Sequence, residues 1–173
     1  MKFSHTHPQF FTATNLEWKQ LLKEDKYKDI AIDSLRFMVR ERRVAIYSFV
    51  IMPNHLHLIW EMLPAFKLKD VQRDFLKFTA QQIKFDLQKH NREWLKEFEV
   101  NAKDRQYQFW ERNPLSVDLY TYEIFVQKLE FIHNNPVQDR WRLCEYPDGY
   151  KYSSARFYET GIDNWGFLTH YQD

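Results

Sequence analysis

Residues 44–62 constrain the fold most, because they have the pattern of two strands joined by a tight turn. The run Val44–Met52 is β-branched, aromatic and almost unbroken, which is typical of a central buried strand. Pro53-Asn54 then predicts a turn, and residues 55–62 alternate strictly. Alternation separates two sets of side chains: Leu56, Leu58, Trp60 and Met62 on one face, and His55, His57, Ile59 and Glu61 on the other. We therefore expect an antiparallel hairpin in which both histidine rings face outward from the core.

The remaining elements predict an α+β protein. Helical spacing of apolar residues indicates helices over 27–43, 68–89 and 122–133. Further strands are expected at residues 9–14 and in the pair of segments 107–110 and 115–120. Two long helices inserted into a four-strand set favour an antiparallel sheet with helices on one face. The charged segment 89–105 is expected to be an excursion between elements.

Composition limits the class of protein. The chain has 173 residues with three Gly and six Pro, so no linker is evident and we expect one domain over 1–173. Lysine plus arginine total 25 and aspartate plus glutamate total 24, so any nucleic-acid binding must come from local patches. No apolar run is long enough to span a membrane, and residues 1–8 lack the apolar run of a secretory signal. With the single Cys144, these features predict a cytoplasmic protein with no membrane partner.

The chemistry of residues 55–57 fits a divalent-cation site. Period-two geometry puts both imidazoles on one strand face, roughly 6–7 Å apart at the backbone, so both can reach one ion. Imidazole suits Mn, Zn, Co or Ni, and it serves Mg when substrate oxygens complete the shell. The other interpretation is a pair of partly buried strand histidines with ordinary hydrogen bonds. The spacing alone favours that second interpretation, and His5-Thr6-His7, which has the same spacing, is assigned no role.

Longer runs around the histidines carry a family resemblance. The run MPNHLHLI at 52–59 closely resembles the signature of the single-tyrosine HUH transposases, where HUH stands for His, hydrophobic, His. Further matching runs follow in the expected order: RDFLKFT at 73–79, QFWE at 108–111, KLEFIHNNPV at 128–137 and YSSA at 152–155. Together they span most of the chain. Within this insertion-sequence type, the REP-associated tyrosine transposase branch fits them best.

This resemblance implies a fold and a reaction. It implies a ferredoxin-like antiparallel sheet with a C-terminal helix that carries the active site, followed by a tail. The two HUH histidines and a polar residue of that helix hold Mg²⁺ or Mn²⁺. A tyrosine one helical turn before the polar residue attacks single-stranded DNA and gives a 5′-phosphotyrosine link and a free 3′-hydroxyl. The usual substrates are imperfect hairpins beside a short guide sequence.

Residue by residue, the resemblance assigns His55 and His57 as metal ligands and Asn135 as the third ligand. An amide oxygen is a hard donor that suits Mg²⁺ or Mn²⁺. The position of the nucleophile is Phe131. Residues 131 and 135 are four apart and therefore share a helix face. Asn135 also lies where the helix should stop before Pro136.

Phe131 departs from the family pattern, because phenylalanine has no hydroxyl with which to form a phosphotyrosine. The sequence is either an engineered tyrosine-to-phenylalanine variant or a natural member that lost or moved its nucleophile. Tyr120 and Tyr122 are the candidates for a moved nucleophile, although packing at the start of the helix is the preferred interpretation. Tyr122 is nine residues from Phe131, about 13 Å along a helix.

Two functions follow, and they belong to different classes. One is a metal-dependent single-stranded DNA transposase whose nucleophile is absent, so that cleavage is not expected although DNA still binds. The other is a non-catalytic hairpin-binding protein domesticated from such an enzyme. A structural zinc protein is a weaker interpretation, because the chain has one cysteine and no four-ligand set.

DNA contacts are expected from cations interleaved with aromatic rings, on the second long helix and in the C-terminal part. The candidate DNA-binding residues are Lys69, Arg73, Lys77, Arg140, Arg142, Lys151 and Arg156. Residues from about 138 to 173 are interpreted as a C-terminal extension. By resemblance to the REP-associated branch, we expect a monomer rather than a homodimer, with single-stranded or hairpin DNA as its partner.

Overall fold

The computed structural model describes residues 7–173. Residues 1–6 lie outside the described part. Most of the segment 1–8, in which the sequence predicts no secretory signal, is therefore not described. Seven elements build the main body: β1 (Gln9–Thr14), α1 (Asp25–Arg40), β2 (Val44–Ile51), β3 (His55–Met62), α2 (Leu68–His90), β6 (Leu115–Asp118) and α4 (Tyr122–Asn134). The smaller elements are α3 (Arg92–Lys96), β4 (Glu99–Ala102), β5 (Arg105–Tyr107) and α5 (Ala155–Thr160).

The sheet has the strand order β2-β3-β1-β6, and all of its pairs are antiparallel. The hairpin expected from the sequence is β2 and β3, and β3 lies between β2 and β1. In this register His57 is opposite Thr12 on one side and Val50 on the other. The sequence predicts a central strand at residues 44–52, and this is wrong, because β2 is an outer strand and the middle strands are β3 and β1. Most side chains of β2 are nevertheless buried, because both faces of the sheet are covered and the C-terminal segment bridges to its outer edge.

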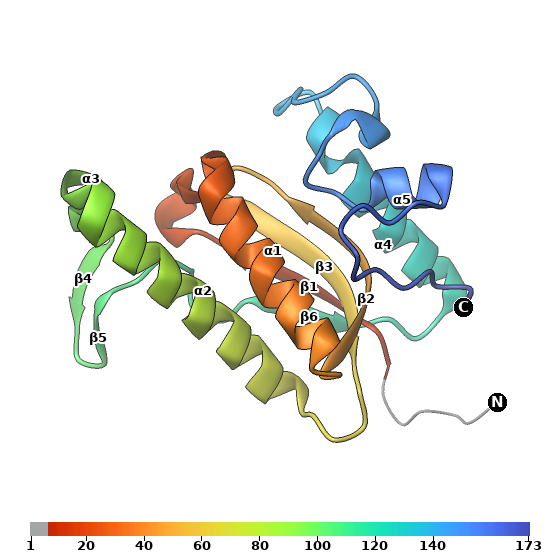
Figure 1. The fold of residues 1–173 in the computed structure, drawn as a ribbon, viewed down its shortest axis with the longest axis horizontal. Helices are drawn as coiled ribbons and strands as arrows, with labels where there is room; N and C mark the ends of the chain where they lie inside the picture. Colours follow the sequence, from red (N-terminus) through yellow and green to blue (C-terminus); the bar gives the residue numbers. More distant parts are fainter. Residues whose placement is uncertain (1–6) are drawn as a thin grey trace.

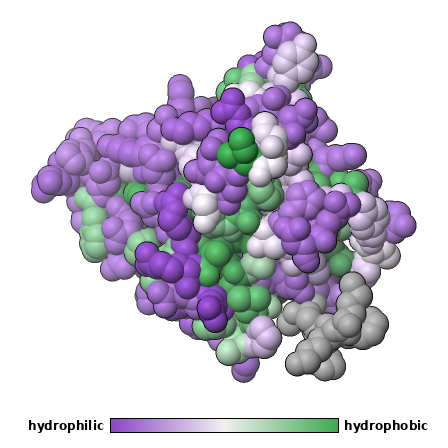
Figure 2. Space-filling view, turned by 45° about the vertical axis from the view of Figure 1, so that its right-hand side comes forward, coloured by the Kyte–Doolittle hydropathy of each residue, from purple (hydrophilic) through white to green (hydrophobic). Residues whose placement is uncertain are grey.

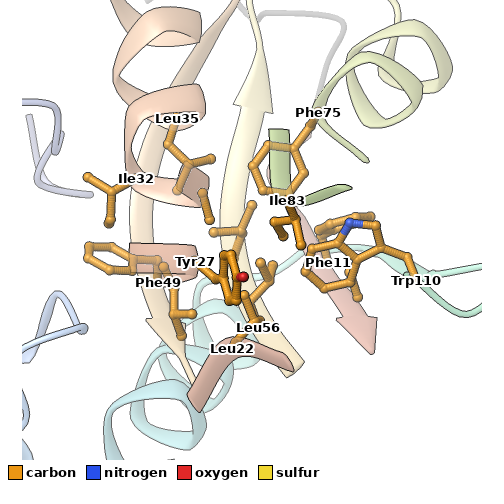
Figure 3. Close-up of a cluster of buried hydrophobic side chains, with 14 of the residues drawn as sticks. Phe11, Leu22, Tyr27, Ile32, Leu35, Phe49, Leu56, Phe75, Ile83 and Trp110 are labelled. Carbon is orange, nitrogen blue, oxygen red and sulfur yellow. The ribbon is translucent and has the colours of Figure 1, made fainter. Parts of the chain in front are cut away.

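Helices α1 and α2 cover one face of the sheet and form the main core with it (Figure 1). Helical spacing turns one apolar stripe of each helix toward the strands. Figure 3 shows these side chains converging, and the fully buried ones include Phe11, Leu35, Phe49, Leu56, Phe75 and Ile83. This core uses the face of β3 that carries Leu56, as the alternation predicts.

Helix α4 covers the opposite face and forms a second, smaller apolar cluster. Its members from the sheet are Phe10, Val50, Met52 and Ile59, and those from α4 and its approach are Leu119, Phe125, Leu129 and Ile132. The expected α+β class is confirmed, with two helices on one face and a C-terminal helix on the other. The face of β3 that carries the histidines is thus buried as well.

The C-terminal segment packs beside β2. The backbone of Ser153 forms an antiparallel bridge with Val50, and that of Leu168 a parallel bridge with Ile46. Thr169 also donates its backbone N–H to the carbonyl oxygen of Ile46 at 2.8 Å. Figure 1 shows this blue segment, with α5, running beside α4. The segment that the sequence marks as an extension therefore contributes contacts to the sheet edge.

Two expectations from the sequence are wrong in detail. The segment 107–110 does not form part of the fourth strand, which is β6 alone; only Trp110 bridges to the sheet, at Asn15. The charged excursion contains α3 and the small β4–β5 hairpin. These elements were missed because their side chains are largely exposed and polar, so they carry no apolar period.

The face in Figure 2 is dominated by hydrophilic side chains, with a hydrophobic strip near its middle. Within residues 7–173, no helix combines the length and the apolar character that crossing a bilayer requires.

Candidate functional site

His55 and His57 lie side by side beneath α4, with ring centroids 4.8 Å apart. Their side chains point away from the main core, as the alternation predicts. The expectation that they face outward is wrong in one respect, since only 4% of His55 and 7% of His57 is exposed. The physical reason is that apolar residues such as Ile59 share this face and draw α4 onto it.

Asn135 reaches the histidines from the end of α4. Thr121 precedes the helix and its hydroxyl accepts the N–H of Ile124 at 3.2 Å, and the last residue of the helix is Asn134. Asn135 keeps helical backbone angles and starts a 3-10 turn that continues through Pro136 to Val137. This geometry buries Asn135 and places its Oδ1 3.0 Å from Nε2 of His55.

Outer partners fix the orientation of both rings. Nδ1 of His55 lies 2.7 Å from Oδ1 of Asn54, and Nδ1 of His57 lies 2.7 Å from the hydroxyl of Thr12. Such second partners orient metal-binding imidazoles in proteins. Neither Asn54 nor Thr12 was singled out from the sequence, although the residue before an HUH pair and the strand register could have indicated them.

Burial keeps both imidazoles neutral at pH 7. Loss of hydration is the main cause that lowers the pKa of His55 to about 4; the hydrogen bond to Oδ1 of Asn135 opposes this shift, and the nearby charge of Arg140 adds to it. Burial likewise lowers the pKa of His57 to about 3, with added repulsion from His55 and Lys128. A neutral imidazole has a free lone pair, which is the form that binds a metal.

The donor set tests whether a cation fits. A neutral His55 carries one N–H, yet both of its ring nitrogens face amide oxygens. If Nδ1 donates to Asn54, then Nε2 and Oδ1 of Asn135 are two acceptors 3.0 Å apart. Two ligands at right angles on one ion, with bonds of about 2.1 Å, are separated by about 3 Å. The residues therefore fit a divalent cation, whereas the bare protein needs the Asn135 amide turned so that its nitrogen donates.

The ligand types also limit the metal. Within residues 7–173, no group of three or more His, Cys, Asp or Glu side chains could hold an ion. A metal bound here depends on the amide oxygen of Asn135 as well as on the two imidazoles. A hard oxygen donor in the set favours Mg²⁺ or Mn²⁺ over a closed zinc site.

Phe131 lies one helical turn before Asn135 and borders the histidines. Its ring centroid is 5.2 Å from that of His57 and 6.0 Å from that of Phe10. The side chain is 40% exposed, so a ligand in solvent can reach it. The position suits a group that acts beside the metal ligands, but a phenyl ring offers no nucleophile.

The two candidate replacement tyrosines have other partners. Tyr120 donates its hydroxyl to Asp118 at 3.0 Å, and the Tyr122 hydroxyl lies 3.5 Å from that of Tyr171. Both side chains are well exposed. Within the described part of the chain, neither forms a hydrogen bond or ring contact with His55 or His57, and the ring of Tyr120 lies against His7 instead, at a centroid distance of 4.8 Å. The geometry therefore favours packing at the start of α4.

Lys128 is a site residue that the sequence analysis did not single out. Its amino group lies 4.9 Å from the ring centroid of Phe10 and 5.7 Å from that of Phe131. The signal was available, because Lys128 is three residues before Phe131 and therefore on the same helix face.

The expected DNA-binding residues fall in three separate places. Arg73 and Lys77 line a groove of about 720 Å³ along α2, together with Lys84, Arg105 and Arg112. Lys151 and Arg156 line a pocket of about 370 Å³ with Tyr150, Phe157 and Trp165. The third place follows α4, where Arg140 lies over the ring of Trp141 near His55 and Arg142 pairs with Asp139. Lys69 is also on α2, but it is exposed and does not line the groove.

Comparison of the whole fold with solved structures identifies a similar protein. A REP-associated tyrosine transposase, solved bound to a REP hairpin, superposes with a TM-score of 0.66. The match covers 96% of this chain and 88% of that one at 17% sequence identity. The chain has the REP-associated tyrosine transposase fold. The fold expected from the resemblance is thereby confirmed.

Other comparisons add little to this result. A protein of Deinococcus radiodurans described as a transposase matches over 78% of this chain and 94% of its own, at 15% identity. Its TM-score of 0.49 is too low to support an argument. No family model matches the sequence, and no curated protein does.

Proposed function

We propose that this protein binds hairpin DNA as a REP-associated tyrosine transposase of the single-tyrosine HUH type. The observation that carries the proposal is the convergence of His55, His57 and Asn135 beside residue 131, within a fold whose solved neighbour holds a REP hairpin. The fold alone allows many activities. The site adds the residue types that metal-assisted attack on a phosphodiester requires.

His55, His57 and Asn135 are the residues that would hold Mg²⁺ or Mn²⁺. A bound ion would withdraw charge from a phosphate oxygen and stabilise the charge that develops during attack. Thr12 and Asn54 hold the imidazoles in one orientation, and α4 excludes water from them. Because both rings are neutral at pH 7, they need to lose no proton before they bind the ion.

Cleavage requires a nucleophile that this chain lacks at position 131. In the family reaction a tyrosine oxygen bonds to phosphorus, the 3′ oxygen of the preceding nucleotide leaves, and a 5′-phosphotyrosine results. Phe131 keeps the ring beside His57 but has no oxygen. We propose that this chain binds its DNA and does not cut it.

A domesticated hairpin-binding protein is the second candidate, and Phe131 is the observation that favours it. The retained geometry of His55, His57 and Asn135 favours the transposase, because binding DNA does not need a metal. The encoding gene separates the two directly. A tyrosine codon at position 131 identifies an engineered variant of an active enzyme.

The proposal is tested by DNA binding. Affinity from phosphate and stacking contacts needs no nucleophile, so the chain as written should bind a hairpin with a single-stranded flank. It should bind that hairpin more tightly than a blunt duplex of equal length. The affinity should fall at least tenfold between about 50 and about 200 mM salt. Equal affinity for both oligonucleotides, measured by fluorescence anisotropy, contradicts the proposal.

A further inference from the structure

Lys128 occupies the same face of α4 as Phe131 and Asn135. It is three residues before the first and seven before the second, which is close to whole turns of the helix. Its amino group lies over the rings of Phe10 and Phe131, 4.9 Å and 5.7 Å from their centroids. These two rings also contact His57, at centroid distances of 5.3 Å and 5.2 Å. The lysine is therefore held beside the metal-binding face, between a strand and a helix.

Lys128 has no ion-pair partner in the described part of the chain. Within residues 7–173, no Asp or Glu forms an ion pair with it, whereas Lys26 and Lys28 on α1 each pair with an aspartate. Aromatic faces attract an ammonium group only weakly, so they replace an anion incompletely. The amino group is half-buried without the partner that such a charge usually has.

A second cation borders the same site from the other side. The guanidinium of Arg140 lies over the ring of Trp141, 5.6 Å from its centroid, and that centroid lies 5.9 Å from the centroid of His55. Two cations around a pair of buried histidines repel one another and any bound metal ion. An anionic ligand between them removes this cost, and a DNA phosphate is such a ligand.

We propose that Lys128 binds the DNA phosphate presented to residue 131. This inference rests on the proposed function and specifies which side chain holds the reacting group. Lys128 is suited to the task because its ammonium group is held over Phe10 and its N–H groups remain able to donate to a phosphate oxygen.

The test pairs one protein change with one DNA change. A hairpin is first selected from a randomised pool by the protein as written. A single neutral methylphosphonate is then moved step by step through its flank. The protein as written should lose about tenfold in affinity at one position, because one charged contact is removed. Lys128→Met should bind the unmodified hairpin about tenfold more weakly, and should show no further loss at that position.

Lys96→Met is the matched control, since it removes one exposed positive charge on α3. It should keep the full methylphosphonate effect. Lys128→Arg, which retains the charge, should recover most of the affinity. If Lys128→Met loses affinity equally with every methylphosphonate position, the lysine does not bind one phosphate and the inference is wrong. If no hairpin is selected at all, the proposed function fails first. Thermal unfolding of each variant checks that the fold is kept.

Discussion

At the scale of single residues, position 131 determines what the site can do. Phe131→Tyr places a hydroxyl on a ring that already lies beside His57, so it should restore a covalent protein–DNA adduct with the selected hairpin and Mn²⁺. The readout is a shifted band with labelled oligonucleotide on a denaturing gel. EDTA should remove the band, because His55, His57 and Asn135 then hold no ion.

The control for that experiment is His57→Gln in the Phe131→Tyr protein, which keeps a polar side chain at a buried position and should give no adduct. An adduct formed by the protein with Phe131 intact would mean that another residue, such as Tyr120 or Tyr122, is the nucleophile. No adduct from Phe131→Tyr on a hairpin that it binds would favour the domesticated binder.

The buried histidines also predict how stability depends on pH. Burial lowers the pKa of His55 and of His133 to about 4, and that of His57 to about 3. In the unfolded chain, the pKa of a histidine is about 6.5. Below that pH the unfolded histidines bind protons that the folded ones do not. The contribution of these histidines to the free energy of unfolding should therefore be fully present above about pH 7. It should fall as pH decreases, by about 1.4 kcal/mol per pH unit for each histidine near pH 5.5.

Urea unfolding in EDTA between pH 7 and 5.5 measures this slope, since few carboxylates titrate in that range. His133→Gln should reduce the slope by the contribution of one histidine. A stability that does not change over this range, or a slope unaffected by the substitution, would show that these histidines are protonated in the folded protein.

At the scale of elements, Ser154 joins three parts of the fold. Its hydroxyl oxygen lies 2.8 Å from Nε2 of His133 on α4 and 3.0 Å from the hydroxyl of Ser48 on β2. It also accepts the backbone N–H of Phe49 at 3.0 Å, beside the bulge in β2. The end of the YSSA run therefore fastens the C-terminal segment to the sheet and to the helix that carries Asn135.

Ser154→Ala should lower the free energy of unfolding by about 1–3 kcal/mol, because it leaves buried polar groups without a partner. Ser116→Ala is the matched control. Ser116 is exposed on β6 and receives one bond from Gln72, so its loss should change stability by less than about 0.5 kcal/mol. Equal effects of the two substitutions in urea unfolding would contradict the assigned role of Ser154.

Elements with a strong apolar pattern could be predicted closely. β3 was expected over 55–62 and spans His55–Met62, and α4 was expected over 122–133 and spans Tyr122–Asn134. Both have one buried face, so their period is visible in the sequence. β4 and β5 are short, exposed and polar, and α3 has one buried residue, Leu95. Such elements have no regular spacing of apolar residues by which the sequence could indicate them.

At the scale of the whole molecule, the fold followed from the sequence better than the site did. The pairing of His55 with Asn135, 80 residues later, came from the family resemblance, because no local pattern indicates how α4 lies on the sheet. The burial of the histidines was missed for the same reason. Thr12 and Lys128 were missed because their roles arise only after β1, β3 and α4 pack together. The monomeric state, the division at about 138 and a cytoplasmic location stay predictions.

The position of the C-terminal segment beside β2 has a consequence for the behaviour of the protein in concentrated solution. A free outer strand offers unpaired backbone groups to other chains and promotes aggregation. The backbones of Ser153 and Leu168 occupy part of that edge of β2, while the opposite edge is β6, a strand of only four residues. The segment 152–173 therefore leaves only part of this edge open to pairing with another chain, independently of any role in DNA binding.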